Sequence, residues 1–62
     1  MSLITTPNLA DPDAAYAALL AAHKGLSEAE SQALNARLVL VLMNHVGTGV
    51  FEEALALAKS AG

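Results

Sequence analysis

The stretch "LVLVLMNHV", residues 38–46, places six aliphatic or thioether side chains in succession before Asn44 and His45. A helix that packs on one side needs only an apolar stripe, so a continuous apolar run needs cover on more than one side. The run is too short to span a bilayer, which requires about 20 apolar residues. The stretch therefore predicts a helix buried among other helices.

Local signals set the ends of this helix at about residues 28–46. The segment "SEAE" can form a capping box, in which Ser27 accepts from the backbone N–H of Glu30 and the Glu30 carboxylate accepts from the N–H of Ser27. No Pro or Gly follows until Gly47, which suits a helix end. A helix of this length is too long to be covered by one short neighbour.

Two shorter helices are expected on either side, at about 12–24 and 50–60. Asp11 can cap the first, Pro12 suits its first turn, and Gly25 can end it. In the segment "GTGV", Thr48 or Gly49 can cap the last helix. The Ala-rich surface of the first helix is explained either by helix propensity or by close approach to a partner helix.

The predicted fold is all-α, a single domain over residues 1–62 built as a small three-helix antiparallel bundle. Residues 1–10 lack periodicity and are expected to form an extended N-terminal arm, whose Leu3, Ile4 and Leu9 can lie on a neighbouring surface. The expected core comprises large apolar residues from all three helices: Leu19, Leu20, Leu34, Leu38, Val41, Leu42, Phe51 and Leu55.

At about 100° per residue, helix 28–46 has one polar stripe, formed by Glu30, Arg37 and Asn44. Two short helices cannot cover everything else, so part of the remaining surface is predicted to meet another chain. The candidate interface residues are Val39, Leu40, Met43 and Val46. Ser31 and Asn35 also lie among apolar positions, where they could fix the register of an oligomer or bond to loop backbone.

Composition excludes several function classes. Hydrophobic residues make up 55% of the chain and charged residues 15%, and the mean hydropathy is +0.48, so a domain of this size has more apolar surface than it can bury alone. A net charge of −3 provides no basic patch for nucleic acid. The chain has no Cys, and its N-terminal segment lacks the features of a signal peptide. We therefore expect a cytoplasmic protein with no nucleic-acid or membrane partner.

Few residues could carry chemistry. The two imidazoles, His23 and His45, are expected near opposite ends of the fold, and His45 with Glu52 or Glu53 falls short of the three protein ligands usual in a catalytic zinc site. His45 is better explained as a helix C-terminal cation favoured by the helix dipole. We expect no catalytic residue, no metal and no cofactor, and hence no enzyme.

Residues 7–47, "PNLADPDAAYAALLAAHKGLSEAESQALNARLVLVLMNHVG", resemble a family of small uncharacterised bacterial helical proteins with a domain of unknown function. The most specific parts are Asn8, Leu9 and Asp11, the "GLS" turn at 25–27, and "LNARLVLVLMNHVG" at 34–47. The family is often encoded beside flavin-dependent aromatic-ring hydroxylases. The resemblance implies a small companion of an oxygenase and transfers no catalytic residue.

Two functions follow from the sequence. The first is a non-catalytic interaction module, either a homo-oligomer or a small companion of a larger protein such as a flavin-dependent hydroxylase. The second is a small-molecule binder with an apolar pocket completed by oligomerisation. The polar residues that could orient an aromatic ligand in such a pocket are Tyr16, His23, Asn35 and His45.

Overall fold

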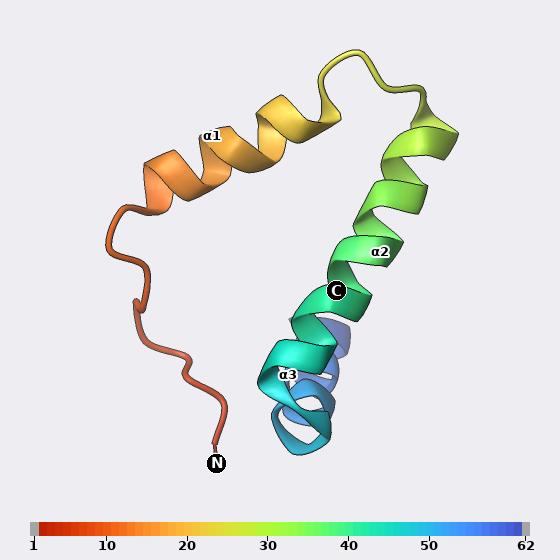
Figure 1. Ribbon diagram of the computed structural model, residues 1–62. Helices are drawn as coiled ribbons and strands as arrows, with labels where there is room; N and C mark the ends of the chain where they lie inside the picture. Colours follow the sequence, from red (N-terminus) through yellow and green to blue (C-terminus); the bar gives the residue numbers. More distant parts are fainter. Residues whose placement is uncertain (1, 62) are drawn as a thin grey trace.

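The computed structural model describes residues 2–61 and consists of three helices that follow an N-terminal arm (Figure 1). They are α1 (Pro12–His23), α2 (Glu28–Val46) and α3 (Thr48–Ala61). Residues 2–11 are not helical, and the described part of the chain contains no strand. The all-α class with three helices is therefore confirmed, and every helix boundary lies within two residues of its expected position.

Side-chain caps fix the starts of α1 and α2. The Asp11 carboxylate accepts a 3.0 Å hydrogen bond from the Ala14 N–H. At α2 the capping box is complete: Ser27 Oγ accepts from the Glu30 N–H at 3.2 Å, and Glu30 Oε1 accepts from the Ser27 N–H at 2.9 Å. Both caps accept hydrogen bonds from backbone N–H groups that would have no partner in an uncapped helix.

The capping box also makes α2 sensitive to acid. The Ser27 backbone N–H, assisted by the Ser27 side chain, lowers the pKa of the Glu30 carboxyl below its ordinary value. Because the folded pKa is the lower one, the stabilisation is fully present above the ordinary carboxyl range. It is lost as the pH falls through the lowered pKa of Glu30.

Gly47 alone joins α2 to α3. Its N–H donates to the Met43 carbonyl at 2.9 Å and its carbonyl accepts from the Phe51 N–H at 3.0 Å, so one residue ends one helix and begins the next. Consequently α3 starts at Thr48, two residues before the expected position, and neither Thr48 nor Gly49 is the cap. With φ 86° and ψ 164°, Gly47 adopts a backbone conformation open essentially to glycine alone.

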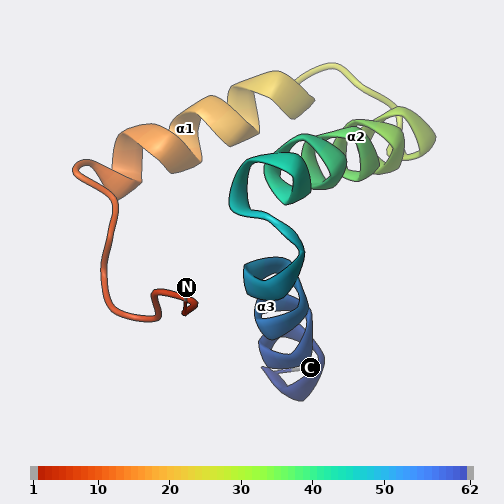
Figure 2. The ribbon, with the colours of Figure 1, turned by 60° about the horizontal axis from the view of Figure 1, so that its bottom comes forward.

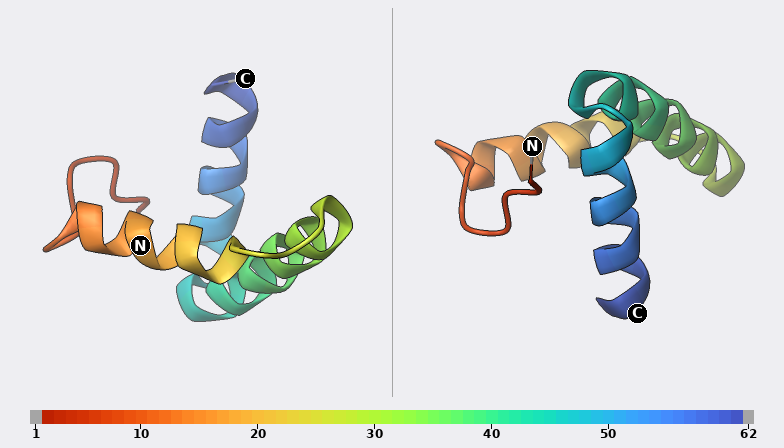
Figure 3. Two further views of the ribbon diagram at one scale, coloured as in Figure 1. Left: turned by 90° about the horizontal axis from the view of Figure 1, so that it is seen from above. Right: turned by 90° about the horizontal axis from the view of Figure 1, so that it is seen from below.

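The helices form an open arrangement. In Figure 1, α1 and α2 diverge from the loop that joins them, and Figures 1 and 2 show α3 at the end of α2 to which it is joined, where the two helices pack. Both views of Figure 3 show α3 projecting away from the other two helices. The radius of gyration is 13.2 Å, whereas a compact domain of this length would have about 10.6 Å. The three helices therefore do not enclose a common centre.

The expected core is not formed within one chain. No residue among 2–61 is buried; Leu34 and Phe51 are half-buried, and the other expected core residues are exposed. Those exposed residues are Leu19, Leu20, Leu38, Val41, Leu42 and Leu55. The prediction of an intramolecular core was wrong because it assumed that α1 folds back onto α2 and α3, whereas α1 lies away from both.

The capping box gives the first testable prediction. Ser27→Ala removes the acceptor for the Glu30 N–H and should lower the free energy of unfolding by about 1 kcal/mol, the usual cost of losing such a cap. Chemical denaturation followed by circular dichroism measures the change. Ser60→Ala is the control, because it removes only an exposed bond from the Ser60 hydroxyl to the Leu57 carbonyl in the last turn of α3 and should be nearly neutral. An unchanged denaturation midpoint for Ser27→Ala would contradict the role of the cap.

Candidate functional site

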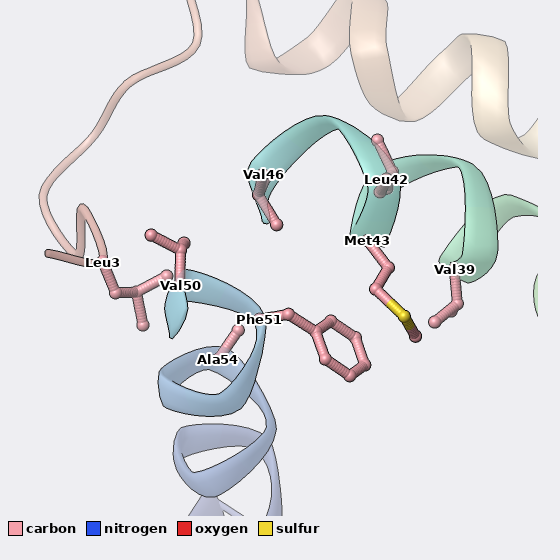
Figure 4. Close-up of a pocket in the computed structure, with 8 residues that line it drawn as sticks. All are labelled: Leu3, Val39, Leu42, Met43, Val46, Val50, Phe51 and Ala54. Carbon is pink, nitrogen blue, oxygen red and sulfur yellow. The ribbon is translucent and has the colours of Figure 1, made fainter. Parts of the chain in front are cut away.

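An apolar groove lies where α2 and α3 meet (Figure 4). Its volume is about 280 Å³. The residues that line it come from the arm, the last two turns of α2 and the first two turns of α3: Leu3, Val39, Leu42, Met43, Val46, Val50, Phe51 and Ala54. We call this site the α2–α3 groove.

Helical spacing explains its two walls. Val39, Met43 and Val46 recur at intervals of four and three residues, which places them on one face of α2. Val50 and Ala54 are likewise one turn apart on α3, with Phe51 beside them. Since Gly47 directs α3 back across the end of α2, the two apolar faces meet at an angle and leave a groove between them.

The arm closes one end of the groove. Leu3 is half-buried although its neighbours in the sequence are exposed, and Figure 4 shows it beside Val50. The N-terminal end of the arm therefore lies beside the start of α3, although the rest of the arm leads from there to α1. Leu3, Met43, Val50, Phe51 and Ala54 are all half-buried, and these five residues form the floor of the groove.

The groove can bind only by apolar contact. All the residues that line it are apolar, so it offers no side chain for acid–base chemistry or for orienting a polar ligand. The Phe51 ring and the Met43 thioether both project into the space, a pairing that suits apolar or aromatic side chains. Val39, Leu42 and Val46 remain 46%, 51% and 40% exposed at its rim.

Three of the four interface residues expected from the sequence line this groove. They are Val39, Met43 and Val46; Leu40 lies outside it and is 60% exposed. Whether the four meet another chain stays a prediction. Leu42 and Phe51, which were assigned to the core, also line the groove, and periodicity had already placed them on the apolar faces of their helices.

The polar residues expected in a ligand pocket do not line the groove. Tyr16 and His23 lie on α1, where Tyr16 is 62% exposed and His23 is half-buried. Asn35 and His45 are exposed on α2. The structure therefore does not bring these four side chains together around the apolar site.

No metal site is evident in residues 2–61. That part of the chain contains no group of three or more His, Asp or Glu side chains placed to hold a metal ion. His45, Glu52 and Glu53 accordingly do not form such a group. Within the same residues, none of the helices combines the length and apolar character needed to cross a membrane.

Fold and site together define a small all-α protein that presents an apolar groove between two helices. A family model matches residues 3–60, almost the whole chain, and the chain belongs to that family, described as "Protein of unknown function (DUF2783)". Comparisons with curated proteins and with solved structures gave no match. The family assignment confirms the resemblance to a domain of unknown function and extends it through α3.

Gly47 gives a prediction about the geometry of the groove. Gly47→Ala forces a side chain into a backbone conformation with φ 86° and should lower the free energy of unfolding by about 1–3 kcal/mol. Gly49→Ala is a matched control, because Gly49 is helical and an added Cβ there meets nothing within 4 Å. The control should be neutral or stabilising by up to about 1 kcal/mol. Equal denaturation midpoints for the two variants would contradict this account of the turn.

Proposed function

We propose that this chain is a non-catalytic protein interaction module whose exposed apolar surface is covered by another polypeptide chain. The observation that carries the proposal is the total accessible surface of the single chain. One chain exposes 5258 Å², whereas a compact monomer of 6.3 kDa would expose roughly 3,700 Å². The excess of about 1,500 Å² exceeds the roughly 800 Å² that each partner contributes to a standard protein interface.

Helix length supports the same conclusion. α1 has 12 residues and α3 has 14, and helices of about this length are marginal in water unless an apolar face is buried. Large apolar side chains are instead exposed on all three helices, including Leu20 at 52%, Val41 at 64% and Leu57 at 51%. Contact with another chain would supply the burial that the separate helices lack.

The second candidate function is binding of a small apolar molecule in the α2–α3 groove. Its support is the groove volume of about 280 Å³, which is close to the lower end of the range for ligand sites. Ligand sites usually also contain a few polar groups that fix orientation, and the residues that line this groove are all apolar. The interaction module is therefore the better-supported proposal.

Where the partner chain is a larger protein, the proposed partner is a flavin-dependent aromatic-ring hydroxylase. Support for this part of the proposal comes only from the resemblance to small proteins often encoded beside such enzymes. Isothermal titration of the purified chain into a purified hydroxylase of this class from the same cell tests it directly. Saturable binding with a fixed stoichiometry is expected, and no heat of binding at micromolar concentrations would contradict the companion role.

Val39→Glu tests the interaction module through its groove. The substitution places a carboxylate on a contact expected to be apolar, where burial of the Val side chain is worth about 1.5–3 kcal/mol, so association should weaken at least about tenfold. Sedimentation equilibrium and circular dichroism should show a lower mass and less helix. Because Glu has a higher helix propensity than Val, a loss of helix would not be a local effect.

Thr48→Glu is the control for this variant. It adds the same charge at the exposed first position of α3, outside the groove, where a carboxylate also suits the helix dipole. It should leave mass and helix content unchanged. Where the wild type sediments as an oligomer, an identical mass for Val39→Glu would contradict a role of the groove in that association.

A further inference from the structure

Among the helices of residues 2–61, α1 has no packing against another helix comparable to that between α2 and α3. Every residue of α1 is exposed except His23, which is half-buried. Its sequence, "PDAAYAALLAAH", is apolar over almost its whole circumference, with Asp13 as its only acid. Helices with that composition are normally buried, so α1 lacks in its own chain the cover that its sequence requires.

Local hydrogen bonds shape the turn that joins α1 to α2. The Lys24 N–H donates to the Ala21 carbonyl at 3.3 Å and the Leu26 N–H to the His23 carbonyl at 3.1 Å. Gly25 follows with φ 80°, and the capping box at Ser27 fixes the start of α2. These bonds and torsions define the turn between α1 and α2, and with this turn α1 lies away from the groove of its own chain.

Closure of α1 onto its own chain would also leave much of α2 uncovered. Leu40 and Val41, 60% and 64% exposed, flank the polar stripe of α2 on opposite sides, and Leu42 at the groove rim is 51% exposed. A single 12-residue helix reaches one flank of α2 at most. Surface of this extent on several sides requires elements from a second chain.

We infer that the second chain is another copy of this protein, with α1 of each copy seated on the α2–α3 groove of the other. This inference rests on the proposed function and names the partner. Each copy offers both a helix without cover and a groove without an occupant, which is the self-complementarity that a twofold dimer needs. Tyr16, Leu19 and Leu20 form the large-residue face of α1 and are exposed in the single chain.

The available area fits an obligate dimer. Burial of the excess of about 1,500 Å² on each copy gives a total of roughly 3,000 Å², within the range of 2,000–5,000 Å² found for obligate homodimers. The groove presents no charged or polar side chain that such a contact would strip of water. Exchange of α1 is therefore compatible with both the size and the chemistry of the surface.

Chemical cross-linking can show whether the α1 that occupies a groove comes from the same chain or from the other copy. The protein has no Cys, so Leu20→Cys with Val39→Cys places one thiol on α1 and one at the groove rim in an otherwise thiol-free chain. Both positions are exposed in the single chain, which limits damage to its own packing. A short bismaleimide is added at micromolar protein concentration, and mass spectrometry measures the masses of the cross-linked products. Sedimentation equilibrium of the wild type is measured separately.

The expected product is a covalent dimer, formed several-fold faster than in a control pair, Leu20→Cys with Lys59→Cys, whose second thiol lies outside the groove on α3. The wild type should sediment at twice the 6.3 kDa of one chain. A chain cross-linked to itself would overturn the inference by showing that α1 closes onto its own groove. A dimer whose cross-linking equals that of the control would overturn the exchange of α1.

A wild type that sediments as a monomer would overturn the second copy as partner. That result is distinct from failure of the proposed function. The proposed function is tested by binding of the chain to the purified hydroxylase and by the effect of Val39→Glu on that binding. Binding that is lost in Val39→Glu, from a monomeric wild type, would keep the interaction module while replacing the partner.

Discussion

Apolar surface that three short helices cannot cover is the constraint on which the rest of this structure depends. The chain is 55% hydrophobic, yet none of residues 2–61 is buried. Interactions within a single helix, such as the capping box of α2, add about 1 kcal/mol each to the free energy of unfolding and cannot replace a core. On the proposal of an interaction module, burial against another chain supplies most of the free energy that holds the fold.

The same constraint connects fold and function. An apolar groove without polar residues has little capacity for catalysis but suits a contact between helices. If the chain folds fully only on association, its folded population depends on its own concentration and on that of its partner. A small companion protein with this property would be ordered when assembled and unstable when alone, which links its amount to that of the assembly.

Local features of the fold were predictable from the sequence, and long-range ones were not. The cap at Asp11, the capping box between Ser27 and Glu30 and the helix end at Gly47 depend on residues within a few positions of one another. The direction of α1 depends on the backbone torsions of the turn at residues 24–27, which side-chain periodicity does not encode. The intramolecular core was predicted wrongly for this reason.

The candidate site shows the same division. Periodicity placed Val39, Met43 and Val46 on one face of α2, and all three line the groove. The sequence could not show which surface Leu3 lies on, because that depends on the path of the arm before α1. Tyr16, His23, Asn35 and His45 were grouped for their chemistry, and only the tertiary arrangement shows that they do not line the groove.

The most direct test of this account is the concentration dependence of thermal unfolding, followed by circular dichroism over at least a hundredfold range of protein concentration. If association supplies the burial that stabilises the helices, the midpoint should rise with concentration and helix content should fall on dilution. A sharp, cooperative transition with the same midpoint at every concentration would show that one chain is stable alone and would contradict the account.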